Sequence, residues 1–295
     1  MASQAILIDS ACAPSPELLS KSQVFQLGMK IKLDDQHYTD GEDLDLEHFY
    51  GQIDKVKDFS TTPPLVRDIK KTCEDLKKKG YSSIISIHVS SKMSKLIETC
   101  ENARNMVSGV DIELIDSQNL SVGANLIAER VIELIDIGMP TNDVISLLPE
   151  IRKSSYMQIS LSTLKYPVKN KRIGRVQGLL GAMLKVRPIL GLDSDGYLTT
   201  LTTERGGNRV VERIAENALS FLEKRPHNRK ICMTWGFDEN HQQVGRVFQS
   251  FSQHIGKNGD RHFNVSKSRM WPTLACNCGP EAYGFAVYGE EHPLG

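Results

Sequence analysis

The segment Ser91-Lys92-Met93-Ser94 follows directly on an apolar strand predicted over Ser83–Val89, and it opens a helix predicted over Ser94–Met106. A helix that starts at the carboxyl end of a parallel strand points its first backbone N–H groups into the ligand crevice. Those groups and the helix dipole favour an anion, and serine hydroxyls add donors without adding charge. The junction therefore predicts a neutral seat for a carboxylate or phosphate. The alternative is that Ser91 or Ser94 simply caps the helix.

His88 lies on the same apolar strand, beside this predicted seat. Buried polar side chains usually find hydrogen-bond partners, so a satisfied core histidine is the favoured interpretation. The linear sequence still leaves open a serine hydrolase in which Ser94 is the nucleophile and His88 the base. Two further strands end in Asp-Ser, at Asp9 and Asp116. We expect both carboxylates to brace the following loops through backbone hydrogen bonds, because bare carboxylates would repel an anionic ligand.

Several common catalytic and cofactor motifs are missing from the sequence. No Gly-x-Gly-x-x-Gly opens a helix after a strand, and no Gly-x-x-x-x-Gly-Lys-Ser/Thr, Gly-x-Ser-x-Gly or His-Glu-x-x-His occurs. Cys276 and Cys278 lack the further ligands that a zinc site needs. In a strand these two would face the same side as small buried residues. The sequence therefore predicts no cofactor and no metal.

Charge and hydropathy restrict the class of partner. Lys plus Arg and Asp plus Glu both number 36, so the formal net charge is zero, and neither nucleic acid nor an anionic membrane is an expected partner. The amino terminus lacks the pattern of a signal peptide, and no apolar run approaches membrane-spanning length. We expect a cytoplasmic protein with reduced thiols and no integral membrane segment.

The candidate residues are positioned by alternating strands and helices. In the first half this alternation predicts a mostly parallel sheet wrapped by helices. The predicted strands are Ile6–Ile8, Val24–Leu33, Ser83–Val89, Ile112–Ile115 and Met157–Leu161. The predicted helices are Asp45–Gln52, Leu65–Lys79, Ser94–Met106, Val122–Ile137 and Asn142–Ser155.

The second half is smaller and predicts a mixed sheet, with antiparallel pairing across the turn Asp193-Ser194-Asp195-Gly196. Its predicted helices are Val176–Leu184, Asn208–Glu223 and Gln242–Ile255. Its predicted strands are Arg187–Leu192, Tyr197–Thr202 and Lys230–Thr234, with others near Phe263–Val265 and Leu274–Asn277. A boundary near Ser160–Tyr166 divides the chain into domains at 1–163 and 164–295.

Five segments, taken in order, resemble the DegV family of fatty-acid-binding proteins. That family carries a strand-end Asp-Ser, a Thr-Ser-x-Pro-Ser loop, a Ser-Ser-x-Leu-Ser-Gly-Thr turn, a Gly-Gly-Arg-Ile-Ser segment and a late His-x-Gly-Pro-Gly. The matching segments are Asp9-Ser10, Ser60-Thr61-Thr62-Pro63-Pro64, Ser90–Leu96, Asn170-Lys171-Arg172 and Asn277-Cys278-Gly279-Pro280-Glu281. The resemblance extends from Ile6 to about Tyr288.

The resemblance implies a two-domain α/β fold of the DegV (EDD) type, with a mostly parallel Rossmann-like sheet in the amino-terminal domain and a smaller mixed carboxyl-terminal domain. Family members bury an acyl chain in the amino-terminal domain and hold its carboxylate where the domains meet. They are non-catalytic carriers that present this carboxylate to a separate fatty acid kinase for phospholipid synthesis. The carboxylate contacts map onto Ser60, Thr61, Ser94 and, in place of the late histidine, Asn277. The arginines of the kinase-facing mouth map onto Arg172 and Arg205.

The departures from the family pattern leave two other functions open. Asn277 replaces the histidine and Glu281 replaces a glycine of the late motif, which favours a lipid sensor uncoupled from any kinase. The remaining rival is an acyl hydrolase or transferase that uses Ser94. Chain length and unsaturation of the ligand, the presence of a kinase partner and the oligomeric state are not determined by the sequence.

Overall fold

The computed structural model describes residues 4–179, 186–255 and 263–295. Its first sheet is four-stranded and wholly parallel, in the order β2-β1-β6-β7. The strands are β2 (Val24–Leu27), β1 (Gln4–Asp9), β6 (Ser83–His88) and β7 (Asp111–Asp116). The two central strands are buried over nearly their whole length, as expected for parallel strands that are covered on both faces.

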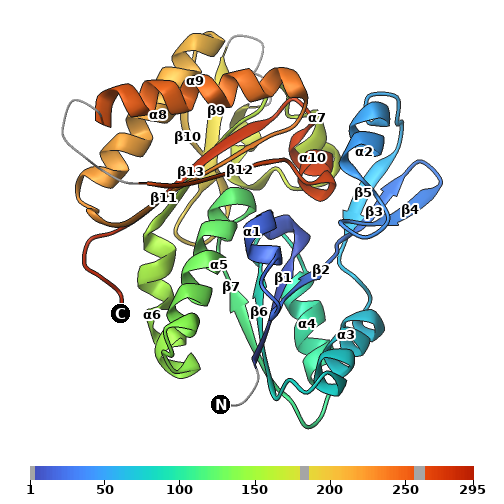
Figure 1. The fold of residues 1–295 in the computed structure, drawn as a ribbon. Helices are drawn as coiled ribbons and strands as arrows, with labels where there is room; N and C mark the ends of the chain where they lie inside the picture. Colours follow the sequence, from blue (N-terminus) through green and yellow to red (C-terminus); the bar gives the residue numbers. More distant parts are fainter. Residues whose placement is uncertain (1–3, 180–185, 256–262) are drawn as a thin grey trace.

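The second sheet is six-stranded and mixed, in the order β10-β9-β8-β13-β11-β12. Its strands are β8 (Ser155–Ser160), β9 (Arg187–Leu192), β10 (Leu198–Glu204), β11 (His227–Trp235), β12 (Asn264–Arg269) and β13 (Tyr283–Glu290). The predicted antiparallel turn joins β9 and β10, and Gly196 in that turn has a φ of +88°. Helices α8 (Gly207–Glu223) and α9 (Asp238–Ile255) cover one face of this sheet (Figure 1). The α/β fold predicted from the sequence is therefore confirmed.

Helix α5 (Ser121–Asp136) lies between the two sheets (Figure 1). It contacts β8, β11 and β13 on one side and the 3₁₀ turn η1 (Ser10–Cys12) on the other. Twelve of its sixteen residues are buried, which is the pattern of a helix enclosed on all sides. The other helices of the first half are α1 (Pro16–Leu19), α2 (Leu46–Gln52), α3 (Val66–Lys78), α4 (Leu96–Arg104) and α6 (Thr141–Lys153). Among the described residues, no helix is both long and apolar enough to cross a membrane.

A third, three-stranded antiparallel sheet was not predicted. It consists of β3 (Lys30–Leu33), β4 (Gln36–Thr39) and β5 (Phe59–Thr62), in the order β4-β3-β5. The single strand predicted over Val24–Leu33 is wrong, because the chain leaves the first sheet at Gly28. A Cβ at Gly28 would lie 2.6 Å from the carbonyl oxygen of Asp40. Glycine at this position lets the end of β4 approach the chain closely.

Strand β8 belongs to the second sheet, although the sequence analysis assigned it to the first domain. It pairs antiparallel with β13 and with β9. The division at residues 163 and 164 stays a prediction, and this pairing favours a boundary between α6 and β8.

The strand predicted near Leu274–Asn277 is wrong, because this segment is helix α10 (Pro272–Cys278). Pro272 occupies the first helical turn, and Gly279 follows the helix with a φ of +94°. Both are ordinary helix-boundary signals. Cys276 and Cys278 therefore do not share one face of a strand. Of the helix predicted over Val176–Leu184, the structure has a 3₁₀ helix at Gly174–Leu179, and residues 180–184 lie outside the described residues.

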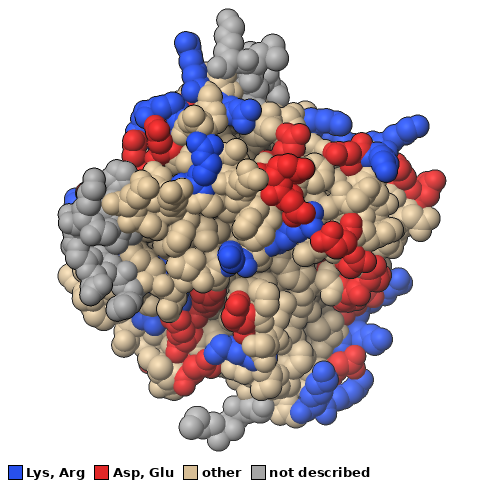
Figure 2. Space-filling view, turned by 45° about the horizontal axis from the view of Figure 1, so that its top comes forward, with Lys and Arg blue, Asp and Glu red and all other residues tan. Residues whose placement is uncertain are grey.

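Both signs of charge are spread over the face of the molecule drawn in Figure 2. No broad field of Lys and Arg covers that face, in keeping with a formal net charge of zero. A surface of this kind gives no electrostatic preference for a polyanion on that side.

Candidate functional site

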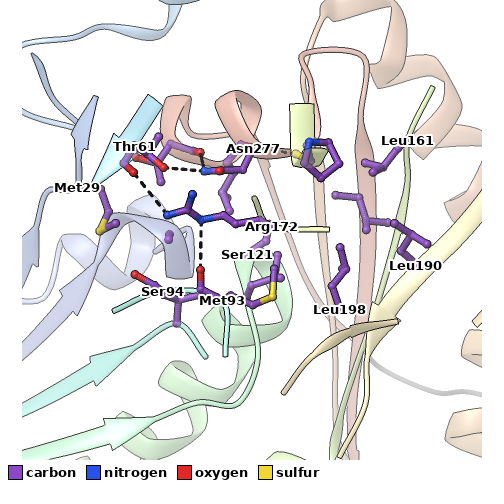
Figure 3. Close-up of a pocket in the computed structure, with 18 residues that line it drawn as sticks. Met29, Thr61, Met93, Ser94, Ser121, Leu161, Arg172, Leu190, Leu198 and Asn277 are labelled. Atoms are coloured by element: carbon purple, nitrogen blue, oxygen red, sulfur yellow. Dashed lines mark hydrogen bonds between the residues drawn. The ribbon is translucent and has the colours of Figure 1, made fainter. Parts of the chain in front are cut away.

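A mostly apolar cavity lies between the two large sheets, with walls from both halves of the chain (Figure 3). Of its eighteen lining residues, twelve are apolar. Those from the first half are Ala11, Met29, Thr61, Val89, Met93, Ser94, Leu120 and Ser121. Those from the second half are Ile159, Leu161, Pro167, Arg172, Leu190, Leu198, Thr273, Leu274, Asn277 and Cys278. The cavity volume is about 70 Å³. A single water molecule needs about 10–15 Å³ of such volume, so the cavity is narrow.

Arg172 is the charged residue of the cavity wall. Its Nε donates to the carbonyl oxygen of Met93 at 3.2 Å, Nη1 to that of Asn170 at 2.9 Å, and Nη2 to that of Thr61 at 3.5 Å. Within the described part of the chain, no carboxylate forms an ion pair with it. Burial lowers the pKa of this guanidinium, which shows that it has lost part of its hydration. An anionic ligand in the cavity would supply the missing counter-charge.

Arg172 thus lines the cavity together with other predicted site residues. The resemblance implied that this arginine lies near a kinase-facing mouth, where it would meet a phosphate or an acidic partner, and that role stays a prediction. The guanidinium lies in the cavity wall and donates to three backbone carbonyl groups, of which those of Met93 and Thr61 are drawn in Figure 3. Those carbonyls fix its position without neutralising it.

Asn277 and Thr61 are brought together beside Arg172. The amide nitrogen of Asn277 donates to Oγ1 of Thr61 at 3.0 Å and to the carbonyl oxygen of Thr273 at 2.7 Å. A backbone carbonyl can only accept, so this contact fixes which end of the amide is the nitrogen. The amide oxygen is buried and has no hydrogen-bond partner among the described residues. The Thr61 hydroxyl accepts from Asn277, which leaves its own hydrogen available for a ligand.

Ser94 lines the cavity but does not begin the helix. Helix α4 starts at Leu96, after a Lys95 cap that makes no side-chain hydrogen bond. Oγ of Ser94 accepts from the Leu96 N–H at 3.2 Å, and the N–H of Ser91 donates to Asp116 at 3.3 Å. The Ser94 hydroxyl oxygen thus has the local role, at the helix start, that the capping interpretation expected. Ser94 lines the cavity, whereas the first turn of α4 does not, and its hydroxyl hydrogen is not used by the bond to Leu96.

Two of the predicted site residues lie elsewhere. Ser60 precedes Thr61 on β5, and because side chains alternate along a strand it points to the opposite face. Arg205 is exposed in the connection between β10 and α8 and does not line the cavity. Neither residue is brought to the group formed by Thr61, Ser94, Arg172 and Asn277.

Ser121, at the start of α5, lines the cavity but was not among the predicted site residues. The predicted helix over Val122–Ile137 began one residue after it. A signal for Ser121 was available in the sequence, because it is a polar residue at the helix start that follows the strand ending at Asp116. That strand, β7, is parallel to β6, so its carboxyl end faces the same crevice.

His88 is a satisfied core histidine, as expected. Its Nε2 lies 2.8 Å from Oγ of Ser86 and its Nδ1 lies 3.2 Å from Oδ2 of Asp9, and all three side chains are buried away from the cavity. Burial alone would lower the pKa of His88, but interactions with Cys100 and Asp9 act the other way, and the pKa is raised to about 10. Both ring nitrogens are thus engaged inside the core, and His88 does not line the cavity to which Ser94 belongs.

The two strand-end carboxylates brace loops, as expected. Asp9 accepts from the N–H groups of Ala11 at 2.8 Å and Val89 at 2.9 Å. Asp116 accepts from the N–H of Gln118 at 2.7 Å. Both carboxylates are thus used by the backbone rather than presented to a ligand. No cluster of three potential metal ligands is found among the residues that the structure describes.

Asp40 anchors α10, the helix that carries Asn277. Its Oδ2 accepts from the N–H of Thr273 at 3.1 Å, while its Oδ1 is buried without a hydrogen-bond partner in the described structure. Burial is the largest influence on this carboxyl, and it raises the pKa of Asp40 to about 6 although hydrogen bonds from Thr273 oppose the shift. Because the folded pKa lies above the unfolded value, the native state binds the proton more tightly. The stability that this provides is complete below about pH 4 and is lost as the pH rises through about 6.

Replacing Asp40 with asparagine is therefore expected to stabilise the protein at pH 7. Two pKa units correspond to about 3 kcal/mol, which is an upper bound for the gain. The amide keeps an oxygen for the Thr273 N–H but cannot ionise, so the free energy of unfolding should vary less between pH 4 and 7. Urea unfolding of both proteins at several pH values measures this. An unchanged pH profile would contradict the assignment of the raised pKa to Asp40.

The chain was compared with known protein families and sequences. The family model described as "Uncharacterised protein, DegV family" matches residues 3–290. A DegV domain-containing protein of Staphylococcus aureus is 28% identical over 222 residues, which cover 75% of this chain and 78% of that protein. A DegV domain-containing protein of Clostridium acetobutylicum is 23% identical over 285 residues, covering 96% of this chain and 98% of the relative.

Solved structures with the same fold include proteins described as binding fatty acids. The fatty-acid-binding DegV family protein of Thermus thermophilus has a TM-score of 0.85 at 21% identity, covering 97% of this chain and 99% of the other. The stearic-acid-binding protein of Eubacterium ventriosum has a TM-score of 0.86 at 21% identity, and both chains are covered completely. These likenesses show a shared fold. Together with the family model, which spans nearly all of the sequence, they establish that the chain belongs to the DegV family.

Proposed function

We propose that the protein binds a long-chain fatty acid in this cavity. Arg172 carries the argument: it is a partly desolvated cation in the wall of an apolar cavity, with only neutral carbonyl partners in the described structure. A fatty acid joins both features, because it carries a carboxylate at the end of a long apolar chain. Its oxygens would be received by Arg172 and by the hydroxyls of Thr61 and Ser94. The fatty-acid-binding function in the names of the Thermus and Eubacterium structures supports the same ligand class.

Burial of the acyl chain would supply most of the affinity. Each buried methylene contributes about 0.8 kcal/mol, whereas a hydrogen bond to a charged group adds about 1.5–3 kcal/mol. A volume of about 70 Å³ is too narrow for a whole chain of this kind, so the walls must move apart on binding. Met29 and Met93 line the cavity, and methionine side chains adapt readily to new shapes because they are unbranched.

We further propose that the protein is a non-catalytic cytoplasmic carrier that presents the carboxylate to a partner kinase. Hydroxyl donors position a carboxylate while leaving an oxygen free to react. The exposed Arg205 is then available to a partner rather than to the ligand. The second candidate, a lipid sensor without a kinase, is favoured by Glu281, the exposed last residue of the late motif, which would repel an ATP-bound partner.

The delipidated protein is expected to bind palmitate with a Kd of about 1 μM or below, because chain burial alone reaches that scale. Isothermal calorimetry measures it directly. Absence of saturable heat with both palmitate and oleate would overturn the proposed function.

Ser94→Ala separates a carrier from an acyl hydrolase in the same experiment. In a carrier this change weakens palmitate binding by about 0.5–2 kcal/mol, the effect of one lost hydrogen bond, and neither protein cleaves a medium-chain ester. Ester cleavage that disappears in Ser94→Ala would favour the hydrolase instead.

A further inference from the structure

Ser121 places an unsatisfied hydroxyl in the cavity wall. The residue is only 2% exposed, and its Oγ has no hydrogen-bond partner among the described residues. Buried hydroxyls are nearly always paired in native proteins. Because this one lines the cavity, its natural partner is a group on whatever the cavity holds.

The start of helix α5 adds to the polarity that the Ser121 hydroxyl gives to this part of the cavity wall. Ser121 is the first residue of the sixteen-residue helix α5, its cap residue Leu120 makes no side-chain hydrogen bond, and the first turn contains no acidic residue. The Gly123 and Ala124 N–H groups bond to the Leu120 carbonyl. Leu120 and Ser121 at this helix end line the cavity. Asn119 accepts from the Leu120 N–H, and the positive end of the helix dipole adds a preference for an oxygen lone pair.

The position of Ser121 separates it from the group that would receive the carboxylate. In Figure 3 it lies between Arg172 and the apolar side chains of Leu190 and Leu198. A carboxylate held by Arg172, Thr61 and Ser94 would direct its chain past this point. An unsubstituted chain would cover Oγ of Ser121 with methylenes and leave it unpaired, which is costly.

We propose that the preferred ligand carries a hydroxyl group on its acyl chain, and that Ser121 at the start of α5 receives this hydroxyl. The proposal rests on the proposed function, because it takes the carboxylate to lie at Arg172. A secondary alcohol both donates and accepts, so it can satisfy Oγ of Ser121 and the helix end together. A second atom in the cavity also needs a donor: Oδ1 of Asn277 is buried and unpartnered in the described structure, and an ionised carboxylate has no hydrogen to offer.

The test compares stearate with its 3-, 10- and 12-hydroxy derivatives by calorimetry on the delipidated protein. At least one hydroxystearate is expected to bind about 3- to 10-fold more tightly than stearate, the gain of one neutral hydrogen bond. Ser121→Ala should abolish this preference and bring the affinities for stearate and the hydroxystearates together, because stearate then no longer covers an unpaired hydroxyl. Because Ser121 has a φ of +53°, Ser121→Gly is a second variant that the local backbone accepts without strain.

Thr234→Val is the matched control. Thr234 is also a fully buried residue with an unpartnered hydroxyl, but it lies outside the cavity. Its replacement should leave the hydroxystearate preference intact. Equal affinity for all four acids, or a preference that survives both Ser121 variants, overturns the proposal while the fatty-acid function stands. Failure of all four acids to bind overturns the proposed function and this inference together.

Discussion

Replacing Arg172 with glutamine is expected to weaken palmitate binding about 10- to 100-fold and to change hexadecanol binding less than about twofold. A hydrogen bond between charged groups contributes about 1.5–3 kcal/mol, and the loss is largest where water is excluded. The guanidinium lines an apolar cavity and has only carbonyl partners in the described structure. A ligand carboxylate would be its only counter-charge there. An alcohol of the same length reports on chain burial alone.

Arg205→Gln is the matched control, because it makes the same chemical change at an exposed arginine outside the cavity. It should leave both affinities unaltered. Since Arg172 also ties three backbone segments together, Arg172→Lys tests whether the charge or the tie is needed. Arg172→Lys is expected to recover part of the palmitate binding, because lysine keeps the positive charge but lacks the planar guanidinium with its several N–H donors. Equal losses for palmitate and hexadecanol in Arg172→Gln would show that the arginine supports the cavity structure rather than an anion.

The parts of the fold that the sequence predicted correctly are those with strong local signals. β1 and β6 are short apolar runs, and α5 and α8 have long apolar periodicity with clear ends. The bracing roles of Asp9 and Asp116 were also predictable, because a carboxylate at a strand end has backbone N–H groups within reach.

Sequence patterns are least informative where tertiary contacts decide the outcome. The sheet to which β8 belongs depends on β13, more than 120 residues further along the chain. The segment of α10 is short and apolar, so helix and strand are hard to distinguish by periodicity, and its remote support from Asp40 is not visible in the sequence. Pro272 and Gly279 were nevertheless readable helix boundaries.

Tertiary contacts also decide which of the predicted site residues come together. Thr61, Ser94 and Asn277 line one cavity, but the alternation of β5 turns Ser60 away. Strand β5 was not predicted. Its partner β3 lies in the segment Val24–Leu33, which was predicted as one long strand. Arg172 reached the cavity through contacts with Met93 and Thr61, which are 79 and 111 residues away. Such distances exceed anything that local spacing can indicate.

Glu290→Gln is expected to lower the free energy of unfolding by about 3–5 kcal/mol, the usual effect of removing one member of a buried ion pair. Glu290 is 1% exposed and accepts from Nε of Arg130 at 2.6 Å, from the Tyr288 hydroxyl at 3.0 Å and from the Leu294 N–H at 3.1 Å. The pair joins β13 of the second sheet to α5, the helix whose first residue lines the cavity. An amide in this place would leave the buried Arg130 with one remaining carboxylate, that of the more exposed Glu133, whose Oε2 lies 3.5 Å from its Nη1.

The neighbouring Glu291→Gln provides the control for this change. Its side chain is 57% exposed and meets Arg225 at 3.1 Å, so its loss should cost less than about 1 kcal/mol. Urea unfolding of the three proteins measures both effects. Adding Arg130→Met to Glu290→Gln should recover part of the lost stability, because the buried cation that has lost Glu290 is then gone and its methylenes are replaced. If the double variant is less stable than Glu290→Gln, the arginine stabilises α5 through its other contacts, among them the Leu294 carbonyl, and the ion pair is not the main link between the two halves.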